Sequence, residues 1–187
     1  MSKSTCSPLK IAVVFGTRPE AIKLAPLINR LKKNPGRFQQ ITIVTAQHRE
    51  MLDQVLDLFS IKPDFDLQII RPRQTLAQIT ARAMTGLHSV FSEIKPDFVV
   101  VQGDTSTTFL GALAGFYNKY AVAHVEAGLR TYQKYYPFPE EINRRLTTVL
   151  ADVHFAPTPE SKKNLLSEGI PENRIWVTGN TVIDALH

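Results

Sequence analysis

The stretch Lys10-Ile-Ala-Val-Val-Phe-Gly-Thr-Arg-Pro-Glu-Ala-Ile-Lys23 decides the fold class of this chain. Its continuous apolar run, residues 11–15, is typical of a strand that is buried on both faces. Gly16 permits a tight turn, and Pro19 suits the first position of a helix, where an N–H would have no helical partner. The stretch therefore predicts a buried strand, a turn and a helix in direct succession.

The same alternation of short apolar runs and longer helical patterns continues along the chain. The expected strands are residues 10–15, 41–45, 66–70, 97–101, 121–125, 153–156 and 174–177. The expected helices are residues 19–33, 49–59, 75–94, 107–118, 140–150 and 160–167. This alternation predicts a doubly wound, mostly parallel α/β sheet of the Rossmann-like class.

The 187 residues correspond to about one domain, which we expect to span residues 9–178. Residues 179–187 form a Gly/Asn turn followed by the beginning of a helix. Because a domain seldom ends partway into an element, we expect 179–187 to open a hinge or second domain whose remainder is missing. A short terminal helix is the alternative.

Charge and composition narrow the function classes. The net charge is +5, but the basic residues are spread out, and the densest cluster, Arg71-Pro-Arg73, is short. We therefore expect no nucleic-acid partner and favour a polyanionic metabolite.

The single cysteine, Cys6, fits a reducing compartment and cannot build a zinc site. The apolar runs are too short for a membrane span or a signal peptide, so we expect no membrane association and a cytoplasmic location.

Ligands of open parallel sheets bind outside the carboxyl ends of the strands, so each strand exit is a candidate site. After the first strand, free N–H groups and the helix dipole attract anions, and Arg18 and Lys23 reach the same space. The alternative is that Glu20 supplies the negative charge and both basic residues are solvated. The loop is neither G-x-G-x-x-G nor a Walker loop, which disfavours dinucleotides and ATP.

Carboxylates also lie at the ends of later expected elements. Asp104 leaves the strand expected at 97–101, either as a helix N-cap or as a group aimed into the crevice. Glu140 and Glu141 open a helix, and the helix dipole is sufficient to explain one of them.

Glu126 follows a buried strand directly, so it begins half buried and needs a partner or a catalytic role. Arg130 is the candidate partner nearest to Glu126 in the sequence. His124 lies two residues before Glu126, so the alternation of side chains along a strand is consistent with both lying on the same face. Together, two cations and three or four carboxylates fit a sugar phosphate or a nucleotide sugar. No cysteine nucleophile, metal-ligand cluster or nucleophile-elbow serine is available in the sequence.

Six motifs in order resemble the non-hydrolysing UDP-N-acetylglucosamine 2-epimerases, over essentially the whole chain from Leu9 to His187. They are Phe15-Gly-Thr-Arg-Pro-Glu-Ala-Ile-Lys23, Thr45-Ala-Gln-His-Arg49, Gly103-Asp-Thr105, His124-Val-Glu-Ala-Gly-Leu-Arg130, Pro139-Glu-Glu-Ile-Asn-Arg144 and Thr178-Gly-Asn-Thr-Val-Ile-Asp-Ala-Leu186. The resemblance implies the N-terminal domain of a two-domain GT-B enzyme whose active site lies between the domains.

The resemblance also implies an activity, the interconversion of UDP-GlcNAc and UDP-ManNAc at C2 through loss and re-addition of UDP. It implies no cofactor and no metal, a homodimer, a role in polysaccharide biosynthesis, and a missing second domain without which this chain is inactive or nearly so. A hydrolysing 2-epimerase, a GT-B glycosyltransferase and a non-catalytic nucleotide-sugar binding domain are the alternatives.

By the same resemblance, Arg18 and Lys23 contact the phosphates or the sugar of the substrate. Asp104, Glu126 and Glu140 are the acid/base and cation-stabilising carboxylates, and the first two also bind substrate; the proton-abstracting group is left open among them. A second, activating UDP-GlcNAc is expected at Gln47, Arg73 and Gln74.

Overall fold

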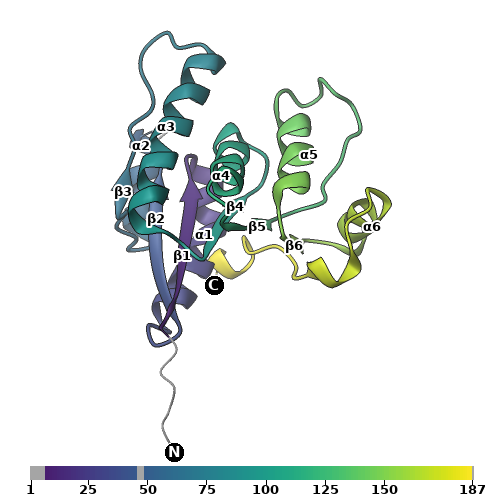
Figure 1. The fold of residues 1–187 in the computed structure, drawn as a ribbon, viewed down its shortest axis with the longest axis horizontal. Helices are drawn as coiled ribbons and strands as arrows, with labels where there is room; N and C mark the ends of the chain where they lie inside the picture. The colour runs from purple at the N-terminus through teal and green to yellow at the C-terminus, as the bar shows by residue number, and fades with distance from the viewer. Residues whose placement is uncertain (1–6, 46–48, 187) are drawn as a thin grey trace, which may run out of the picture.

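The computed structural model describes residues 7–45 and 49–186 (Figure 1). Within them, seven strands form one parallel sheet in the order β3-β2-β1-β4-β5-β6-β7. The strands are β1 (Leu9–Phe15), β2 (Phe38–Val44), β3 (Phe65–Asp66), β4 (Phe98–Gln102), β5 (Ala121–Val125), β6 (Val153–Ala156) and β7 (Ile175–Val177). The order reverses between β1 and β4, and the predicted doubly wound Rossmann-like sheet is confirmed.

Helices cover both faces of this sheet. They are α1 (Arg18–Lys32), α2 (Arg49–Leu58), α3 (Leu76–Ile94), α4 (Ser106–Tyr117), α5 (Glu140–Leu150) and α6 (Pro159–Ser167), with short 3₁₀ turns η1 (Glu172–Arg174) and η2 (Asp184–Leu186). Figure 1 shows α3, α4 and α5 next to one another, and the pairs α3–α4 and α4–α5 are in contact. None of the helices in the described part of the chain is long and apolar enough to cross a membrane.

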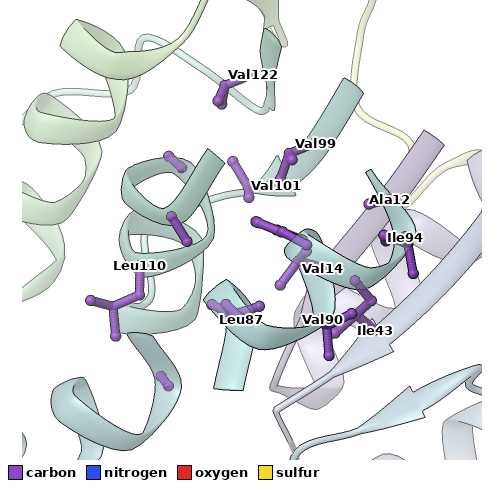
Figure 2. Packing of buried hydrophobic residues seen from close by; sticks show 14 of the residues in the cluster. Ala12, Val14, Ile43, Leu87, Val90, Ile94, Val99, Val101, Leu110 and Val122 are labelled. Carbon is purple, nitrogen blue, oxygen red and sulfur yellow. The ribbon is translucent and has the colours of Figure 1, made fainter. Parts of the chain in front are cut away.

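Strand β1 is buried from both sides, which explains its unbroken apolar run. Ala12 and Val14 pack with α3 and α4 in one core cluster, where Leu87 and Leu110 lie (Figure 2). Val13 belongs to the second cluster, with α1 and α2. Because successive side chains of a strand point to opposite faces, a strand between two helical layers must be apolar at every position.

Apart from shifted boundaries, the largest being the start of β2 at Phe38 and not at residue 41, two predicted elements differ from the structure. The strand expected at 66–70 is reduced to Phe65–Asp66. Gln68 takes a positive φ of 45° and donates its N–H to Asp66 Oδ1 at 3.1 Å, so a local turn replaces the ladder. After the Gly/Asn turn the chain forms only the 3₁₀ turn η2, which lies against α1. The proposed division at residue 179 stays a prediction.

Candidate functional site

The candidate site lies where β1, β4 and β5 end, beside the reversal of strand order. Gly16, which follows β1, allows the neighbouring segments to approach closely. A Cβ there would overlap Thr45 Oγ1 and lie 2.5 Å from Thr107 Oγ1, and these two hydroxyls are 2.8 Å apart. The exits of β1, β2 and β4 are therefore packed together at a point that only glycine fits.

Glu20 occupies part of the anion site expected at the start of α1. Its buried carboxylate accepts hydrogen bonds from the N–H groups of Gly16 at 2.9 Å and Thr17 at 2.7 Å. Burial raises the pKa of this carboxyl, and the hydrogen bonds that it accepts oppose the rise. The alternative, in which Glu20 supplies the negative charge at the start of the helix, therefore holds for the N–H groups of Gly16 and Thr17.

The two cations of the turn differ in what they contact. Arg18, the first residue of α1, is exposed, and its side chain has no hydrogen-bond or ion-pair partner within residues 7–45 and 49–186. Lys23 is not simply solvated, because its ammonium group lies 2.7 and 2.6 Å from the two carboxylate oxygens of Glu126. One guanidinium thus remains available to an anion, and the ammonium group is already placed beside a carboxylate.

Glu126 is the centre of a cluster drawn from four segments. Besides Lys23, its carboxylate accepts hydrogen bonds from the side-chain amides of Gln102, at the end of β4, and Asn180, the latter at 3.2 Å. Its side chain is 12 % exposed, and its backbone has a φ of +65°. A non-glycine residue in this region is uncommon and often belongs to a functional site.

The expected pairing of Glu126 with Arg130 is wrong. Arg130 donates to both carboxylate oxygens of Glu168 at 2.7 Å and to Thr148. The chain turns sharply at Gly128, which has a φ of +89° and packs against the backbone of α6. After this turn, Arg130 contacts α5 through Thr148 and the end of α6 through Glu168, and it does not pair with Glu126.

Asp104 is held by α5 and is not a helix cap. Its carboxylate forms an ion pair with Arg144, and its carbonyl oxygen accepts a hydrogen bond from Asn143 at 3.0 Å. Thr105 is the N-cap of α4, accepting from the N–H of Thr108 at 3.2 Å. The capping alternative for Asp104 is therefore wrong, and its side chain remains at the strand exit.

Of the two glutamates that open α5, one is structural. Glu141 is fully buried and accepts hydrogen bonds from the N–H groups of Thr131 at 3.1 Å and Tyr132 at 3.0 Å. Glu140 is partly exposed, and its carboxylate has no such partner in the described part of the chain. The arrangement leaves Glu140 able to act on a ligand.

The residues expected to bind a second nucleotide sugar lie elsewhere. Arg73 is exposed, with a φ of +58°. Gln74 donates to the carbonyl of Ile69 at 3.0 Å and accepts from the N–H of Arg71, so its amide holds its own loop. Gln47 lies outside the described residues. The hydrogen bonds of Gln74 do not reach the Glu126 cluster.

His124 is a neutral structural residue. It is fully buried, and its Nε2 lies 2.7 Å from the carbonyl oxygen of Gly103, to which it donates. Burial lowers its pKa to about 3. Its neighbour across the β5–β6 ladder, His154, is also buried, and burial lowers its pKa to about 4. Both rings are therefore neutral near neutral pH, and both are fully buried within the sheet.

The buried histidines predict a loss of stability in mild acid. The folded pKa of His154 is about 4 against an ordinary value of 6.5, so the unfolded chain binds its proton first as the pH falls. Stability present above pH 6.5 is therefore lost progressively toward pH 4, by about 1.4 kcal/mol per pH unit for each such histidine. His154→Leu should remove one such contribution from the slope of the unfolding free energy against pH. Urea unfolding between pH 7 and 4.5 measures this slope. The exposed His88, replaced by leucine, serves as the control, and an unchanged slope in His154→Leu would contradict the prediction.

Several contacts of the cluster are invisible in the sequence alone. Lys23 and Glu126 are 103 residues apart, and Asn180 lies 54 residues beyond Glu126. The Thr178-Gly-Asn180 motif was a signal for Asn180, but its spacing says nothing about which carboxylate it meets. Among the described residues, no group of three or more His, Cys, Asp or Glu side chains could hold a metal ion.

Comparison with known proteins gives consistent matches. The family model described as UDP-N-acetylglucosamine 2-epimerase matches residues 29–187. A UDP-N-acetylglucosamine 2-epimerase of Bacillus subtilis (strain 168) is 62 % identical over 179 residues, covering 96 % of this chain and 47 % of its own length. The chain therefore spans about half the length of the curated relatives it matches.

Solved structures match equally well. The UDP-GlcNAc 2-epimerase of Neisseria meningitidis, bound to UDP-GlcNAc, has a TM-score of 0.93 and 58 % identity over 95 % of this chain and 48 % of its own. The enzyme of Methanocaldococcus jannaschii, in complex with UDP-GlcNAc and UDP, has a TM-score of 0.89 and 42 % identity, covering 95 % of this chain and 48 % of its own.

Proposed function

Because the chain belongs to the UDP-N-acetylglucosamine 2-epimerase family, we propose that it forms one half of an enzyme that interconverts UDP-GlcNAc and UDP-ManNAc without hydrolysing them. The observation that carries this proposal is the cluster at the strand exits. Lys23, Gln102 and Asn180 converge on the carboxylate of Glu126, and Arg18 stands at the start of α1 with no ion-pair partner among the residues that the structure describes.

The reaction must invert C2, whose hydrogen is not beside a carbonyl, so direct abstraction is difficult. Loss of UDP from C1 gives the ring oxocarbenium character, while a carboxylate takes the proton from C2. The products are 2-acetamidoglucal and UDP. Re-addition of UDP to C1, with a proton delivered to the opposite face of C2, gives the epimer. The sequence is redox-neutral and needs anionic stabilisers with positioned acid/base groups.

The described residues supply these groups. We propose that Arg18 and Lys23 bind the diphosphate and stabilise the charge that develops on departing UDP. Asp104, Glu126 and Glu140 serve as acid/base groups and stabilise the cationic sugar, with Asp104 fixed by Arg144 and Glu126 by Lys23. We propose that the uridine contacts come from the second half found in the relatives, so that the 187-residue chain alone is inactive or nearly so.

Product analysis tests this function. The protein produced from its complete reading frame, incubated with UDP-GlcNAc and followed by ¹H and ³¹P NMR, should yield UDP-ManNAc. Free ManNAc with UDP would instead identify a hydrolysing epimerase. Sugar transfer only on addition of an acceptor would identify a glycosyltransferase. Binding of UDP-GlcNAc by this chain as tightly as by the complete protein, without turnover, would favour a binding domain.

Three further proposals rest on the resemblance. We expect a homodimer, which analytical ultracentrifugation checks, and a cytoplasmic enzyme that feeds polysaccharide synthesis.

We also expect Gln47, Arg73 and Gln74 to hold an activating UDP-GlcNAc. Replacing the exposed Arg73 with alanine should then weaken activation by excess UDP-GlcNAc and leave the Glu126 cluster intact, as initial-rate curves would show.

A further inference from the structure

The carboxylate of Glu20 spans two turns that the sheet ladder leaves unconnected. The paired positions of β1 and β4 run from Ile11–Phe98 to Val13–Val100, so they end before either strand does. Beyond that point, the Glu20 carboxylate accepts from Thr17 on its own turn and from Thr105, at 2.5 Å, on the turn after β4. Glu20 therefore joins the two strand exits at the reversal of strand order, where neighbouring crossovers leave in opposite directions.

Each of the joined turns carries part of the proposed site. Arg18 and Lys23 lie on the Glu20 side, within the first two turns of α1. Asp104 directly precedes Thr105 on the other side. A shift of one turn against the other would therefore move the cations that bind the diphosphate relative to a carboxylate that faces the sugar.

The link also extends to Glu126. Thr108 Oγ1 lies 3.0 Å from the Glu20 carboxylate and 2.6 Å from the carbonyl oxygen of Gln102. The side chain of Gln102 in turn donates to Glu126. Glu20 is 2 % exposed, and both contacts of Thr108 are buried, so this part of the link is shielded from competing water.

We propose that Glu20 is a positioning residue, whose contacts to Thr17 and Thr105 fix the spacing between the cations of the β1–α1 turn and the carboxylates at the ends of β4 and β5. This inference rests on the proposed function, because it assigns those groups to one substrate. Glu20 itself is buried beneath the turn and acts through the groups that it holds.

The test compares Glu20→Ala with Glu20→Gln in the protein produced from its complete reading frame. Alanine removes the link and should lower kcat/KM for UDP-GlcNAc by about 100-fold, mostly through kcat, because misplacement of catalytic groups by about 1 Å has that effect. Glutamine should restore most of the loss. Its amide oxygen can accept from the Gly16 and Thr17 N–H groups, and its NH₂ can donate to the threonine hydroxyls.

Two controls separate positioning from loss of stability. Ile28→Ala removes a buried side chain from the same helix, away from the turns, and should lower Tm without lowering kcat/KM. Thr105→Ala removes both an N-cap and the contact to Glu20, whereas Thr158→Ala removes the N-cap of α6 and no contact to Glu20. Thr105→Ala should lower kcat/KM at least about tenfold more than Thr158→Ala. This pair decides the question if Glu20→Ala does not fold.

The outcomes are distinguishable. Glu20→Ala with the kcat/KM of Ile28→Ala, or Thr105→Ala with that of Thr158→Ala, overturns the role of Glu20 and leaves the epimerase function standing. A glutamine variant as inactive as the alanine variant also overturns it, since the link would then not be the cause. A wild-type protein that makes no UDP-ManNAc overturns the function itself, and this inference with it.

Discussion

Replacing Glu126 with glutamine is expected to lower kcat for UDP-GlcNAc epimerisation by about 10²- to 10⁴-fold, the usual contribution of a general acid or base. The amide keeps the shape of the side chain but cannot take up a proton or balance the ammonium group of Lys23, 2.6 Å away. KM should change much less than kcat, because Arg18 and the contacts to the rest of the nucleotide remain. Steady-state kinetics on the protein from its complete reading frame measures both constants.

Glu168→Gln is a matched control for this variant. Glu168 is also a partly buried carboxylate that accepts two hydrogen bonds from one cation, Arg130, but it lies at the end of α6 and outside the cluster. Its loss should affect stability more than turnover. If Glu126→Gln retained the activity of Glu168→Gln, Glu126 would have only a structural role.

Gly128→Ala is expected to destabilise the fold by about 2–6 kcal/mol, the sum of backbone strain and overpacking. Gly128 has a φ of +89°, and an added Cβ would overlap the carbonyl oxygen of Ser161 and lie 2.8 Å from its carbon. Both are backbone atoms of α6, so no side chain can rotate away. This is a large part of the total stability of about 5–15 kcal/mol expected of a natural protein.

The chain contains a control that isolates the clash. Gly169 has nearly the same φ, +85°, but a Cβ there would meet nothing within 4 Å. Gly169→Ala should therefore show only the strain, about 1–3 kcal/mol. Urea unfolding of both variants gives the comparison. Equal losses would show that close packing against α6 contributes nothing.

The sequence predicted the elements of this fold well where burial and hydrogen bonding agree. Residues 11–15 are apolar because β1 lies between two helical layers, so periodicity and structure coincide. The strand predicted at residues 66–70 was wrong because burial and hydrogen bonding do not agree there. Ile69 is buried against the same core as α3, but the chain at Gln68 has a positive φ and leaves the ladder. An apolar pattern reports burial, and burial alone does not specify a strand.

The sequence predicted where the candidate site lies in the sheet, but it did not predict which side chains contact one another there. The rule that ligands bind at strand exits led to Arg18, Lys23, Asp104 and Glu126 without any knowledge of the contacts. It could not say that Lys23, and not the nearer Arg130, meets Glu126, because such pairing depends on how the turn at Gly128 directs the chain. The contact of Asn180 with Glu126 was likewise unpredictable, because the spacing of the motif after the last strand does not specify which carboxylate Asn180 meets.

The most direct test of the proposed reaction is hydrogen exchange at C2. The protein from its complete reading frame should be incubated with UDP-GlcNAc in D₂O and the nucleotide sugars examined by NMR and mass spectrometry. Removal of the C2 proton by a carboxylate predicts one deuterium at C2 of UDP-ManNAc and its gradual appearance in recovered UDP-GlcNAc. UDP-ManNAc that retains the original C2 hydrogen would contradict the account.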